Sequence, residues 1–347
     1  MAGDRSRKLG RAVAGLVAGM AACLAAIGAG QAQTPVRFSL DWRWEGPAAP
    51  FAVALDKGYF KAEGLDVTID PAAGSREPIS RVASGTYDAG FGDVNSLVRL
   101  RDENPGTDIK AVMVIYDRPP FAIIGRKSRG IGTDVASLQR KTFGAPVADG
   151  AFAQWPIFKS VNKIDDSTMK FENIGFPVRE PMLAQGEVDA VFGFSMSSYI
   201  NLKSRGVPTE DIVVLLMSDY GVDLYGNAIM VSEKFAKEKP EAVKGLLRAI
   251  MKGVQDTVKD PAAAVDSVIK RNDVAKKDVE LERLKMVLDQ NMITPWVKEN
   301  GFGGIDKARF AASLDQIGLT FKYKSKPQVE DVFTDAFLPP SDQRKVN

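Results

Sequence analysis

The sequence predicts an α/β fold made of two similar lobes, and three observations support this prediction. The chain has 347 residues, which is too many for one ordinary domain and suits two. Short apolar strand patterns alternate with amphipathic helix patterns, as in mainly parallel sheets flanked by helices. One phrase also occurs twice, as REPISRVASGTYDAGFGD from Arg76 and as REPMLAQGEVDAVFGF from Arg179.

The first lobe is expected to begin with a strand–helix–strand unit. The segments 36–41 and 65–70 alternate apolar and polar residues, which predicts two half-buried strands. Between them a helix is expected to open at Gly46, to carry an apolar stripe from Phe51 to Tyr59, and to stop near Gly64. The connection should be right-handed.

The repeated phrase continues this alternation, because each copy reads as a helix that ends at glycine and a strand that finishes in Phe-Gly. Glycine at a strand end also serves folding alone, so Phe91, Gly92, Phe192 and Gly193 have an architectural interpretation as well. A polar passage at 126–140 is expected to lead into the second lobe. Further strands are expected at 109–116, 141–146, 169–174, 211–217 and 225–232, the last as the return path.

From Glu233 the chain is expected to be mostly helical. The strongest pattern is an amphipathic helix that begins at Pro240 and cannot continue past Pro261. More amphipathic segments follow up to about residue 292 and again at 306–317, and we expect them to pack back onto the first lobe. The tail after Lys322 is expected to be irregular.

The first 32 residues are typical of an export signal. Four basic residues precede an uncharged apolar stretch at 12–30, and cleavage after Ala32 fits the small residues there. Two alternatives stay open, namely an uncleaved membrane anchor and a lipoprotein attached through Cys23. Cleavage would change the basic and acidic totals from 46 and 44 to 42 and 43, so no basic face is left to indicate nucleic-acid binding.

Cleavage would also remove Cys23, the only cysteine, and the whole chain contains no histidine. This composition excludes a disulfide framework, zinc sites built on Cys or His, and catalytic triads or pairs that use histidine as the base. No nucleotide-binding glycine loop is present either. We therefore expect no catalytic residues, no metal and no cofactor.

Three phrases in order, namely LDW at 40–42, PFAVALDKGYFKAEGLDVTI at 50–69 and GSREPISRVASGTYDAGFGD at 74–93, resemble the periplasmic solute-binding proteins of ABC importers. The similarity is to the branch for nitrate, sulfonate, taurine and thiamine precursors, the SsuA/THI5-like or NMT1-like proteins. This resemblance implies the type II periplasmic binding protein fold, in which two crossing strands join the lobes and a ligand binds between them. The implied division is a signal at 1–32, lobe one at 36–120 and 230–347, and lobe two at 121–229.

The resemblance also implies a function. The chain would be a monomeric, periplasmic protein that captures a small molecule and delivers it to a membrane permease. The fungal pyrimidine synthase of thiamine biosynthesis shares the LDW start but depends on a histidine and a cysteine-rich motif, which the mature chain lacks. An enzyme using carboxylate or lysine chemistry, and a sensory domain, are the alternatives.

In lobe one, loops at the strand ends supply the candidate ligand-binding residues. Trp42 or Trp44 would stack on a flat ligand, although Trp42 has an alternative as a buried anchor beneath its loop. Arg76 would form a fork for an anion, or a plain surface ion pair. Asp93 has an alternative as a helix cap. The lobe-one candidates are Asp41, Trp42, Trp44, Glu45, Ser75, Arg76, Asp93, Asn95 and Ser96.

In lobe two, a helix start offers bare amides beside Asp149 and Gly150. Arg179 occupies the place of Arg76 in the second copy of the phrase, with the same two interpretations. The remaining candidates are Asp149, Gly150, Phe152, Arg179, Phe194, Ser195 and Asn227. The aromatic rings favour a small polar organic ligand with a flat part, such as a pyrimidine-like ring. The arginines favour a sulfonate or an aromatic carboxylate as the alternative.

Overall fold

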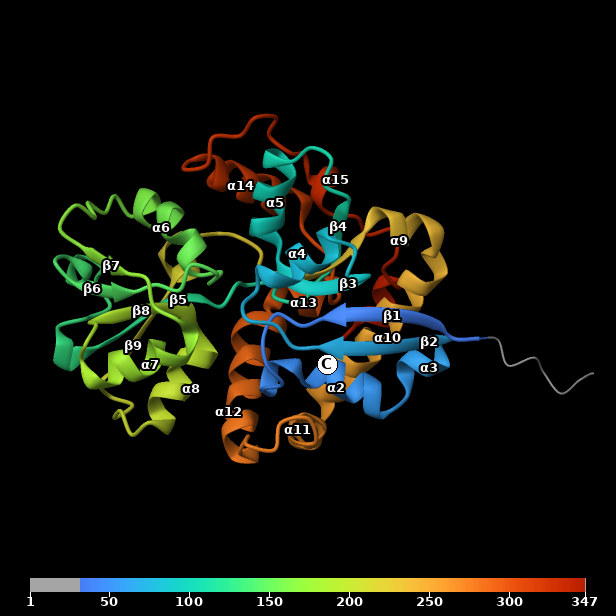
Figure 1. Cartoon of the computed structure of the whole chain (residues 1–347), viewed down its shortest axis with the longest axis horizontal. Coiled ribbons are helices and arrows are strands. Elements are labelled where there is room, and N and C mark those ends of the chain that lie inside the picture. Colours follow the sequence, from blue (N-terminus) through green and yellow to red (C-terminus); the bar gives the residue numbers. More distant parts are fainter. Residues whose placement is uncertain (1–31, 347) are drawn as a thin grey trace, which may run out of the picture. The chain divides into compact units, whose positions relative to one another are not determined.

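The computed structural model describes residues 32–346, and its residues from Pro35 onward form one compact unit that contains two sheets (Figure 1). Of the expected export segment only Ala32 lies inside the described residues, so the expectations for the signal and for Cys23 stay predictions. Within the described part of the chain, no helix has the length and apolar character needed to cross a membrane.

The first sheet has five strands in the order β2-β1-β3-β10-β4. Its strands are β1 (Thr34–Ser39), β2 (Leu65–Asp70), β3 (Ala89–Asp93), β4 (Ile109–Val114) and β10 (Asn227–Ser232). The helices between them are α2 (Ala49–Asp56), α3 (Tyr59–Ala62), α4 (Glu77–Ala83) and α5 (Val94–Glu103). The expected first helix is in fact two, because Gly58 adopts the left-handed conformation with φ of 69° and breaks it.

The second sheet also has five strands, in the order β7-β6-β8-β5-β9. Its strands are β5 (Phe121–Arg126), β6 (Thr142–Gly144), β7 (Lys170–Glu172), β8 (Ala190–Phe194) and β9 (Ile212–Leu216). The helices are α6 (Trp155–Val161), α7 (Phe176–Gln185) and α8 (Ser195–Ser204). We call the first sheet with its helices lobe one and the second sheet with its helices lobe two.

One strand in each sheet runs against its neighbours. β10 is antiparallel to both β3 and β4, and β5 is antiparallel to both β8 and β9. In contrast, β1 pairs with β3, and β6 pairs with β7 and β8, in parallel. Both sheets are therefore mixed, and the two antiparallel strands are those that follow the passages between the lobes.

These pairings show where the chain passes between the two sheets. β5 already belongs to the second sheet, so the chain changes sheets before the polar passage at 126–140. β10 pairs with the first sheet from Asn227 onward, three residues before the expected return at residue 230. The wider division into domains stays a prediction.

The two copies of the repeated phrase form α4–β3 and α7–β8, at corresponding places in the two sheets. Their helices begin differently. Arg76 is the residue that caps α4, whereas α7 begins at Phe176 and so contains Arg179 and Pro181 in its interior. Relative to the repeated phrase, α7 begins four residues earlier than α4, and this places the second arginine inside the helix, which the matching letters did not indicate.

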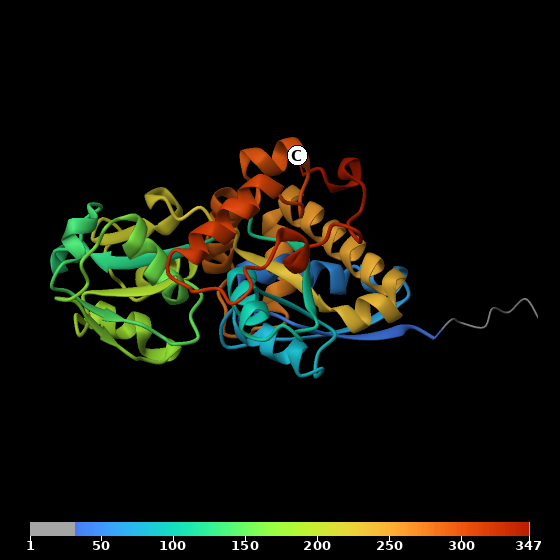
Figure 2. The same ribbon diagram turned by 90° about the horizontal axis from the view of Figure 1, so that it is seen from above.

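The C-terminal helices cover lobe one, as expected, and are seen in orange and red in Figure 2. They are α9 (Glu233–Glu238), α10 (Pro240–Lys259), α11 (Pro261–Ile269), α12 (Lys277–Val287), α13 (Pro295–Asn300), α14 (Lys307–Gly318) and α15 (Val329–Val332). α10 packs closely on α2, because a Cβ added at Gly253 would lie 2.1 Å from the Pro50 carbonyl oxygen. α12 departs from the expectation, since it also packs on α8 of lobe two.

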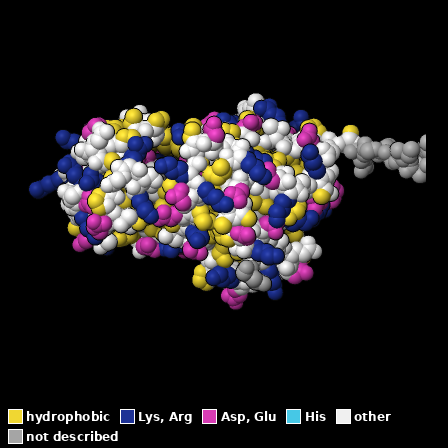
Figure 3. Space-filling view, turned by 90° about the horizontal axis from the view of Figure 1, so that it is seen from below, with side chains coloured by type: hydrophobic (Ala, Val, Ile, Leu, Met, Phe, Trp, Pro, Cys, Tyr) yellow, Lys and Arg dark blue, Asp and Glu magenta, His cyan; other side chains and the backbone are white. Residues whose placement is uncertain are grey.

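Basic and acidic side chains are interspersed on the face shown in Figure 3. Ion pairs among the described residues include Lys203 with Glu282 and Lys57 with Asp256. This face therefore presents no large field of one sign.

Candidate functional site

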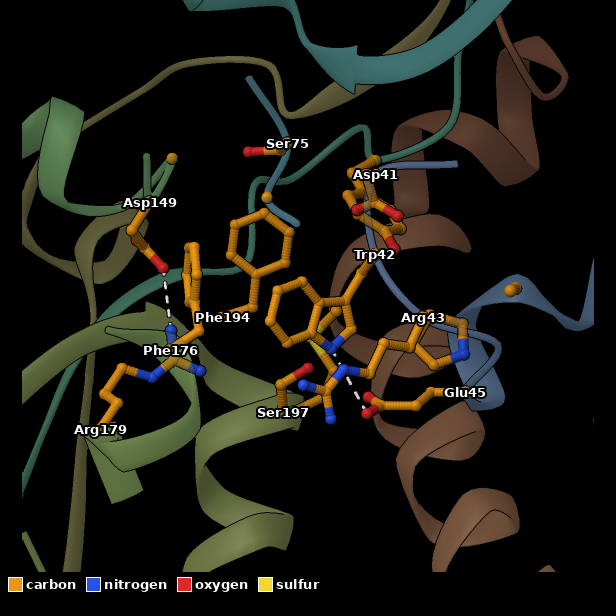
Figure 4. Close-up of a pocket in the computed structure, with 16 residues that line it drawn as sticks. Asp41, Trp42, Arg43, Glu45, Ser75, Asp149, Phe176, Arg179, Phe194 and Ser197 are labelled. Carbon is orange, nitrogen blue, oxygen red and sulfur yellow. Dashed lines mark hydrogen bonds and ion pairs between the residues drawn. The ribbon is translucent and has the colours of Figure 1, made fainter. Parts of the chain in front are cut away.

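A pocket of about 550 Å³, including the part that is open to solvent, lies between the two lobes (Figure 4). Lobe one contributes the loop after β1, the turn before α4, and Tyr116 after β4. Lobe two contributes the loop after β6, the inner side of α7, and the junction of β8 with α8. The lining residues are Asp41, Trp42, Arg43, Glu45, Pro47, Ala48, Gly74, Ser75, Tyr116, Asp149, Gly150, Phe176, Arg179, Phe194, Met196 and Ser197.

Backbone geometry places Ser75 at the pocket. Gly74 adopts a φ of 119°, a conformation that side-chain-bearing residues rarely take, and so permits the turn before α4. The Ser75 carbonyl oxygen then accepts a hydrogen bond of 2.9 Å from the Asp93 amide. A Cβ at Gly92 would lie only 2.8 Å from that oxygen, so this glycine allows α4 to approach β3 closely.

The lobes touch each other around the pocket. The Arg76 guanidinium donates to the Val147 carbonyl oxygen at 3.2 Å, and Arg99 donates to the Gln154 side chain at 2.8 Å. Gly150 lies so near Ser75 that an added Cβ would come within 2.6 Å of its hydroxyl. The structure is therefore a closed arrangement of the two lobes.

Aromatic rings from both lobes meet at the pocket. Trp42 contacts Phe176 edge-on, with ring centroids 4.9 Å apart, and its indole N–H donates to Glu45 at 3.3 Å. Phe194 lies 6.4 Å from Tyr116 between centroids. Figure 4 shows Trp42, Phe176 and Phe194 side by side at the centre of the site. Such a group of rings suits a flat ligand.

Acidic groups form the lobe-one wall of the pocket. Burial raises the pKa of Asp41 to about 7, and the nearby Glu45 carboxylate adds to the shift. Burial also raises the pKa of Glu45, although Arg283 opposes this change. The pKa of Tyr116 is raised well above its usual range by burial first and then by the charges of Asp41 and Glu45. Asn227 donates to Asp41 at 2.9 Å and so orients it.

Arg179 is held by carboxylates of its own lobe. It donates to Asp149 at 2.9 Å and to Glu180 at 2.8 Å, and all three side chains are buried. Burial opposes its charged form, but Glu180 and Asp149 outweigh this and raise the pKa of Arg179. Its expected role as a clamp for an anionic ligand stays a prediction, and two carboxylates already offset its charge.

Half of the sequence-predicted site residues line the pocket. They are Asp41, Trp42, Glu45, Ser75, Asp149, Gly150, Arg179 and Phe194. Their contact with a ligand stays a prediction. The other half do not line it, and they are Trp44, Arg76, Asp93, Asn95, Ser96, Phe152, Ser195 and Asn227.

Two corrections concern lobe-one residues that face elsewhere. Trp44 packs against the lobe-one core, and the Arg271 guanidinium lies 5.3 Å from its ring centroid. Its ring points away because it stands two residues after Trp42 in a loop that turns rather than in a continuing strand. Arg76 is exposed and contacts the backbone of lobe two instead of the pocket.

The other corrections concern residues that serve the fold. Asp93 caps α5 by accepting from the amides of Asn95 and Ser96, each at 3.0 Å, as its alternative interpretation proposed. Phe152 packs on Phe192, with centroids 5.1 Å apart. The Ser195 amide donates to the Pro120 carbonyl oxygen at 2.8 Å.

Sequence reasoning missed half of the lining. The missed residues are Arg43, Pro47, Ala48, Gly74, Tyr116, Phe176, Met196 and Ser197. Arg43, Pro47 and Gly74 adjoin predicted candidates, so a wider window around those loops includes them. The sequence around Tyr116 and Phe176 did not indicate a binding site. The end of a buried strand and the start of a helix have the same local sequence pattern whether or not they face a cleft.

The described residues contain no group of three or more Cys, Asp or Glu side chains placed to hold a metal ion. The pocket lining itself offers aromatic rings, hydroxyls, carboxylates and the guanidinium groups of Arg43 and Arg179. Such a set can bind a flat molecule that carries hydrogen-bond donors.

The comparisons with known proteins agree with this geometry. The model of the family described as NMT1/THI5 like matches residues 47–264. The chain is 26% identical to the riboflavin-binding protein RibY of Chloroflexus aurantiacus, covering 84% of this chain and 82% of that one. It is 28% identical to a formylaminopyrimidine-binding protein of Halalkalibacterium halodurans, covering 80% and 82%. It is 24% identical to the 4-amino-5-hydroxymethyl-2-methylpyrimidine phosphate synthase THI5 of Saccharomyces cerevisiae, covering 86% and 90%.

Solved structures show the fold. The aliphatic sulphonate binding protein SsuA of Escherichia coli superposes with a TM-score of 0.68 at 12% identity, covering 88% of this chain and 99% of that one. The nitrate-binding protein NrtA of Synechocystis gives 0.67 at 13% identity, covering 90% and 91%. The expected two-lobed periplasmic binding protein fold is confirmed.

Proposed function

The chain belongs to the NMT1/THI5-like family, and from this premise we propose that it is the extracytoplasmic solute-binding component of an ABC transporter. In this proposal a small polar organic molecule binds between the lobes, and the closed protein delivers it to a membrane permease. The relatives named for binding riboflavin and formylaminopyrimidine support a binding role. The expected export signal supports a periplasmic location.

One observation carries this proposal. The pocket is lined from both lobes, and the hydroxyls of Ser75 and Tyr116 reach it buried and without a hydrogen-bond partner among the described residues. An unpartnered buried hydroxyl is costly, so a ligand that bonds to it stabilises the closed arrangement. A molecule that touches both lobes only when they are closed shifts the population toward closure.

The ligand class that we favour has a flat, pyrimidine-like part. Trp42, Phe176 and Phe194 supply the rings on which such a part would lie. The second candidate is a sulfonate or an aromatic carboxylate, and the exposed guanidinium of Arg43 at the pocket is the observation in its favour.

An enzymatic role is the competing proposal, because some relatives are named as synthases. The absence of histidine from the chain argues against chemistry that needs an imidazole. The binding proposal is therefore the stronger of the two.

A thermal-shift screen of the protein without residues 1–32 tests the proposal. A true ligand at about 100 times its dissociation constant adds roughly 2.7 kcal/mol to the free energy of unfolding. Pyrimidines, flavins, sulfonates and aryl carboxylates form the panel, and mass spectrometry of the bound fraction follows. Recovery of the unchanged ligand supports binding, whereas turnover of the compound supports the enzyme.

A further inference from the structure

Two passages of the chain join the sheets, and they lie against each other. The first passage covers residues 115–120 between β4 and β5, and the second covers residues 217–226 between β9 and β10. The Gly226 amide donates to the Tyr116 carbonyl oxygen at 2.9 Å. A Cβ added at Gly226 would lie 2.7 Å from the Tyr116 Cβ and 3.0 Å from the Pro119 Cα, so this glycine permits the close approach.

Helix α14 holds the second passage with one of its faces. Arg309, Ser313 and Gln316 are spaced by four and three residues, so they lie on the same side of the helix. The Ser313 hydroxyl donates to the Asp223 carbonyl oxygen at 2.9 Å. The Gln316 side chain donates to the Gly221 carbonyl oxygen at 2.7 Å and accepts from the Asp223 amide at 3.0 Å. The bonds from Ser313 and Gln316 thus go to the backbone of the passage.

Arg309 reaches both passages at once. Its guanidinium donates to the Asp117 carboxylate at 3.1 Å and to the Asp117 carbonyl oxygen at 2.9 Å, in the first passage. It also donates to the Leu224 carbonyl oxygen at 3.0 Å, in the second passage. The guanidinium carbon lies 4.1 Å from the centroid of the Tyr225 ring. A fork with several donors, which arginine alone provides, makes this double contact.

The first passage has further bonds to the C-terminal segments. Asp117 is 4% exposed, and the Thr294 hydroxyl donates to its carboxylate at 2.5 Å. Burial disfavours the charged form of Arg309, but Asp117 outweighs burial, so the pKa of Arg309 is raised. The Arg118 amide donates to the Asn291 carbonyl oxygen at 3.1 Å, and the Asn291 side chain donates to the Arg118 carbonyl oxygen at 3.0 Å. Residues 117 and 118 are therefore fixed to the segments that cover lobe one.

The next residues of each passage bond to lobe two instead. In the first passage, the Pro120 carbonyl oxygen accepts from the Ser195 amide of α8 at 2.8 Å. In the second, the Tyr220 carbonyl oxygen accepts from the Asn162 side chain, at the end of α6, at 3.0 Å. The partners of the backbone therefore change from one lobe to the other within two residues in each passage. Gly221 adopts a φ of 82°, a conformation that favours glycine, at the second change.

We infer that α14, through Arg309, fixes both passages to lobe one, and that lobe two turns about Pro119 and about the junction of Tyr220 with Gly221. This inference goes beyond the proposed function, because it concerns the motion of the chain and holds whatever compound binds. Hinges of this kind consist of a few residues that absorb the change in backbone angles. The Arg118 side chain crosses the pivot to Ser218 at 2.8 Å, and its length allows it to follow a rotation.

Spin labels test the inference in the absence of a ligand. Lys203→Cys on α8 and Glu282→Cys on α12 report the distance between the lobes in the protein without residues 1–32. Arg309→Gln removes the double contact, so the distance distribution should broaden roughly 1.5-fold, because the passages then bend along their whole length. Gln316→Ala, which loses two bonds to the second passage, should broaden it less. Parent-like widths in both folded variants would overturn the inference.

Lys307→Ala is the matched control on the same helix. The Lys307 side chain is exposed and pairs at 3.3 Å with the exposed Glu330, which belongs to neither passage. This variant should keep the distance distribution of the parent. A broadening as large as that in Arg309→Gln would show that any change in α14 has the same effect, and the role assigned to Arg309 would fail.

Hydrogen exchange separates a hinge role from a purely structural one. In Arg309→Gln, the amides of Asp223 and Gly226 should exchange about tenfold faster than in the parent, whereas the amides of β1 and β2 should keep their rates. Equal acceleration throughout lobe one would mean that Arg309 only stabilises the fold, which overturns the inference. If Arg309→Gln does not fold, the same measurements on Gln316→Ala decide the question.

The thermal-shift screen decides the solute-binding function separately. A protein that binds a compound of the screen, but whose passages are unaffected by Arg309→Gln and Gln316→Ala, keeps its proposed function and loses this inference. A protein that binds nothing in the screen, but whose passages loosen in these variants, keeps the hinge and loses the function.

Discussion

Trp42 and Trp44 stand two residues apart, and the structure sends their rings to different places. Trp42 lines the pocket and contacts Phe176 across the lobes, whereas Trp44 packs on the lobe-one core beneath Arg271. Both rings reduce their exposure to water, as a large apolar ring must. They therefore form a natural matched pair in which one variant probes binding and the other probes stability.

Trp42→Ala should weaken the binding of the tightest compound found in the screen by about tenfold or more, which corresponds to about 1.4 kcal/mol. The reason is that the ligand loses an aromatic face and the cleft loses its contact with Phe176. Trp44→Ala should lower the melting temperature and leave the affinity nearly unchanged. Calorimetric titration and thermal unfolding of both variants measure this, and equal affinity losses would contradict the assignment.

Asp41 should give the protein a measurable pH dependence. Its pKa rises on folding from 3.8 to about 7, chiefly because the carboxyl group is buried. Between these values the folded state binds more protons than the unfolded state, so stability falls as the pH rises from about 4 to about 7. Each pKa unit corresponds to about 1.4 kcal/mol, so a rise of about three units makes the loss on the order of 4 kcal/mol.

Asp41→Asn should remove this part of the pH dependence. The amide oxygen can still accept from Asn227, which donates to Asp41 at 2.9 Å, so the variant should remain folded. Denaturant unfolding of both proteins at pH 4, 5.5, 7 and 8 provides the measurement. The variant should gain stability relative to the parent as the pH increases, and parallel pH profiles would show that Asp41 titrates normally.

At the scale of elements, the contact between α12 and α8 joins the two lobes beside the pocket. Arg283 of α12 is buried, and it donates to the Ser197 carbonyl oxygen and to the Asn201 side chain of α8. On its own side it pairs with Glu280, which also accepts from the Gly46 amide at 2.6 Å. Glu280 and Arg283 of α12 therefore connect the loop that contains Gly46 to α8 of lobe two.

Asn201→Ala should weaken ligand binding about threefold to tenfold, because the closed arrangement loses a hydrogen bond to a charged group that the open one need not make. Lys203→Ala is the matched control on the same two helices. It removes an exposed ion pair with Glu282 at 2.7 Å, and such pairs contribute little in water. Calorimetry on both variants measures the difference, and a larger effect at Lys203 would place the closure contact at the surface.

At the scale of the whole compact unit, the contacts between the two lobes depend on the lobes being closed. Arg76 reaches Val147, Arg99 reaches Gln154, and Trp42 reaches Phe176. The first two contacts are hydrogen bonds and the third is aromatic, and contacts of this kind can break and re-form as an interface opens and closes. The two passages between the sheets, before β5 and before β10, are the places where such a motion would be absorbed.

Binding of a ligand should therefore shift the protein toward the closed arrangement of the two lobes. Spin labels at Lys203→Cys and Glu282→Cys report on the distance between α8 and α12, and the chain without residues 1–32 contains no other cysteine. With the tightest compound of the screen, the distance distribution should be short and narrow. Without it, a longer and broader component should appear. Identical distributions in both states would mean that the lobes do not move on binding.

The sequence by itself determined many of the elements and their order, although it did not indicate β5, α8 or the break between α2 and α3. The alternating residues of β1 and β2 and the amphipathic α10 were predictable, because periods of two and 3.6 residues depend only on neighbours along the chain. The repeated phrase likewise indicated α4–β3 and α7–β8. The loops at strand ends located half of the pocket lining, since parallel strands present their carboxyl ends at one edge of a sheet.

Only the tertiary structure decided which polar side chains already have a hydrogen-bond or ion-pair partner and which remain available to a ligand. Arg179 matched Arg76 letter for letter, yet Asp149 and Glu180 enclose it, because α7 begins four residues earlier in the repeated phrase than α4 does. Tyr116 had no distinguishing pattern, yet its hydroxyl reaches the pocket without a partner among the described residues. Partnership and burial are set by residues far apart in the chain, and local periodicity carries no information about them.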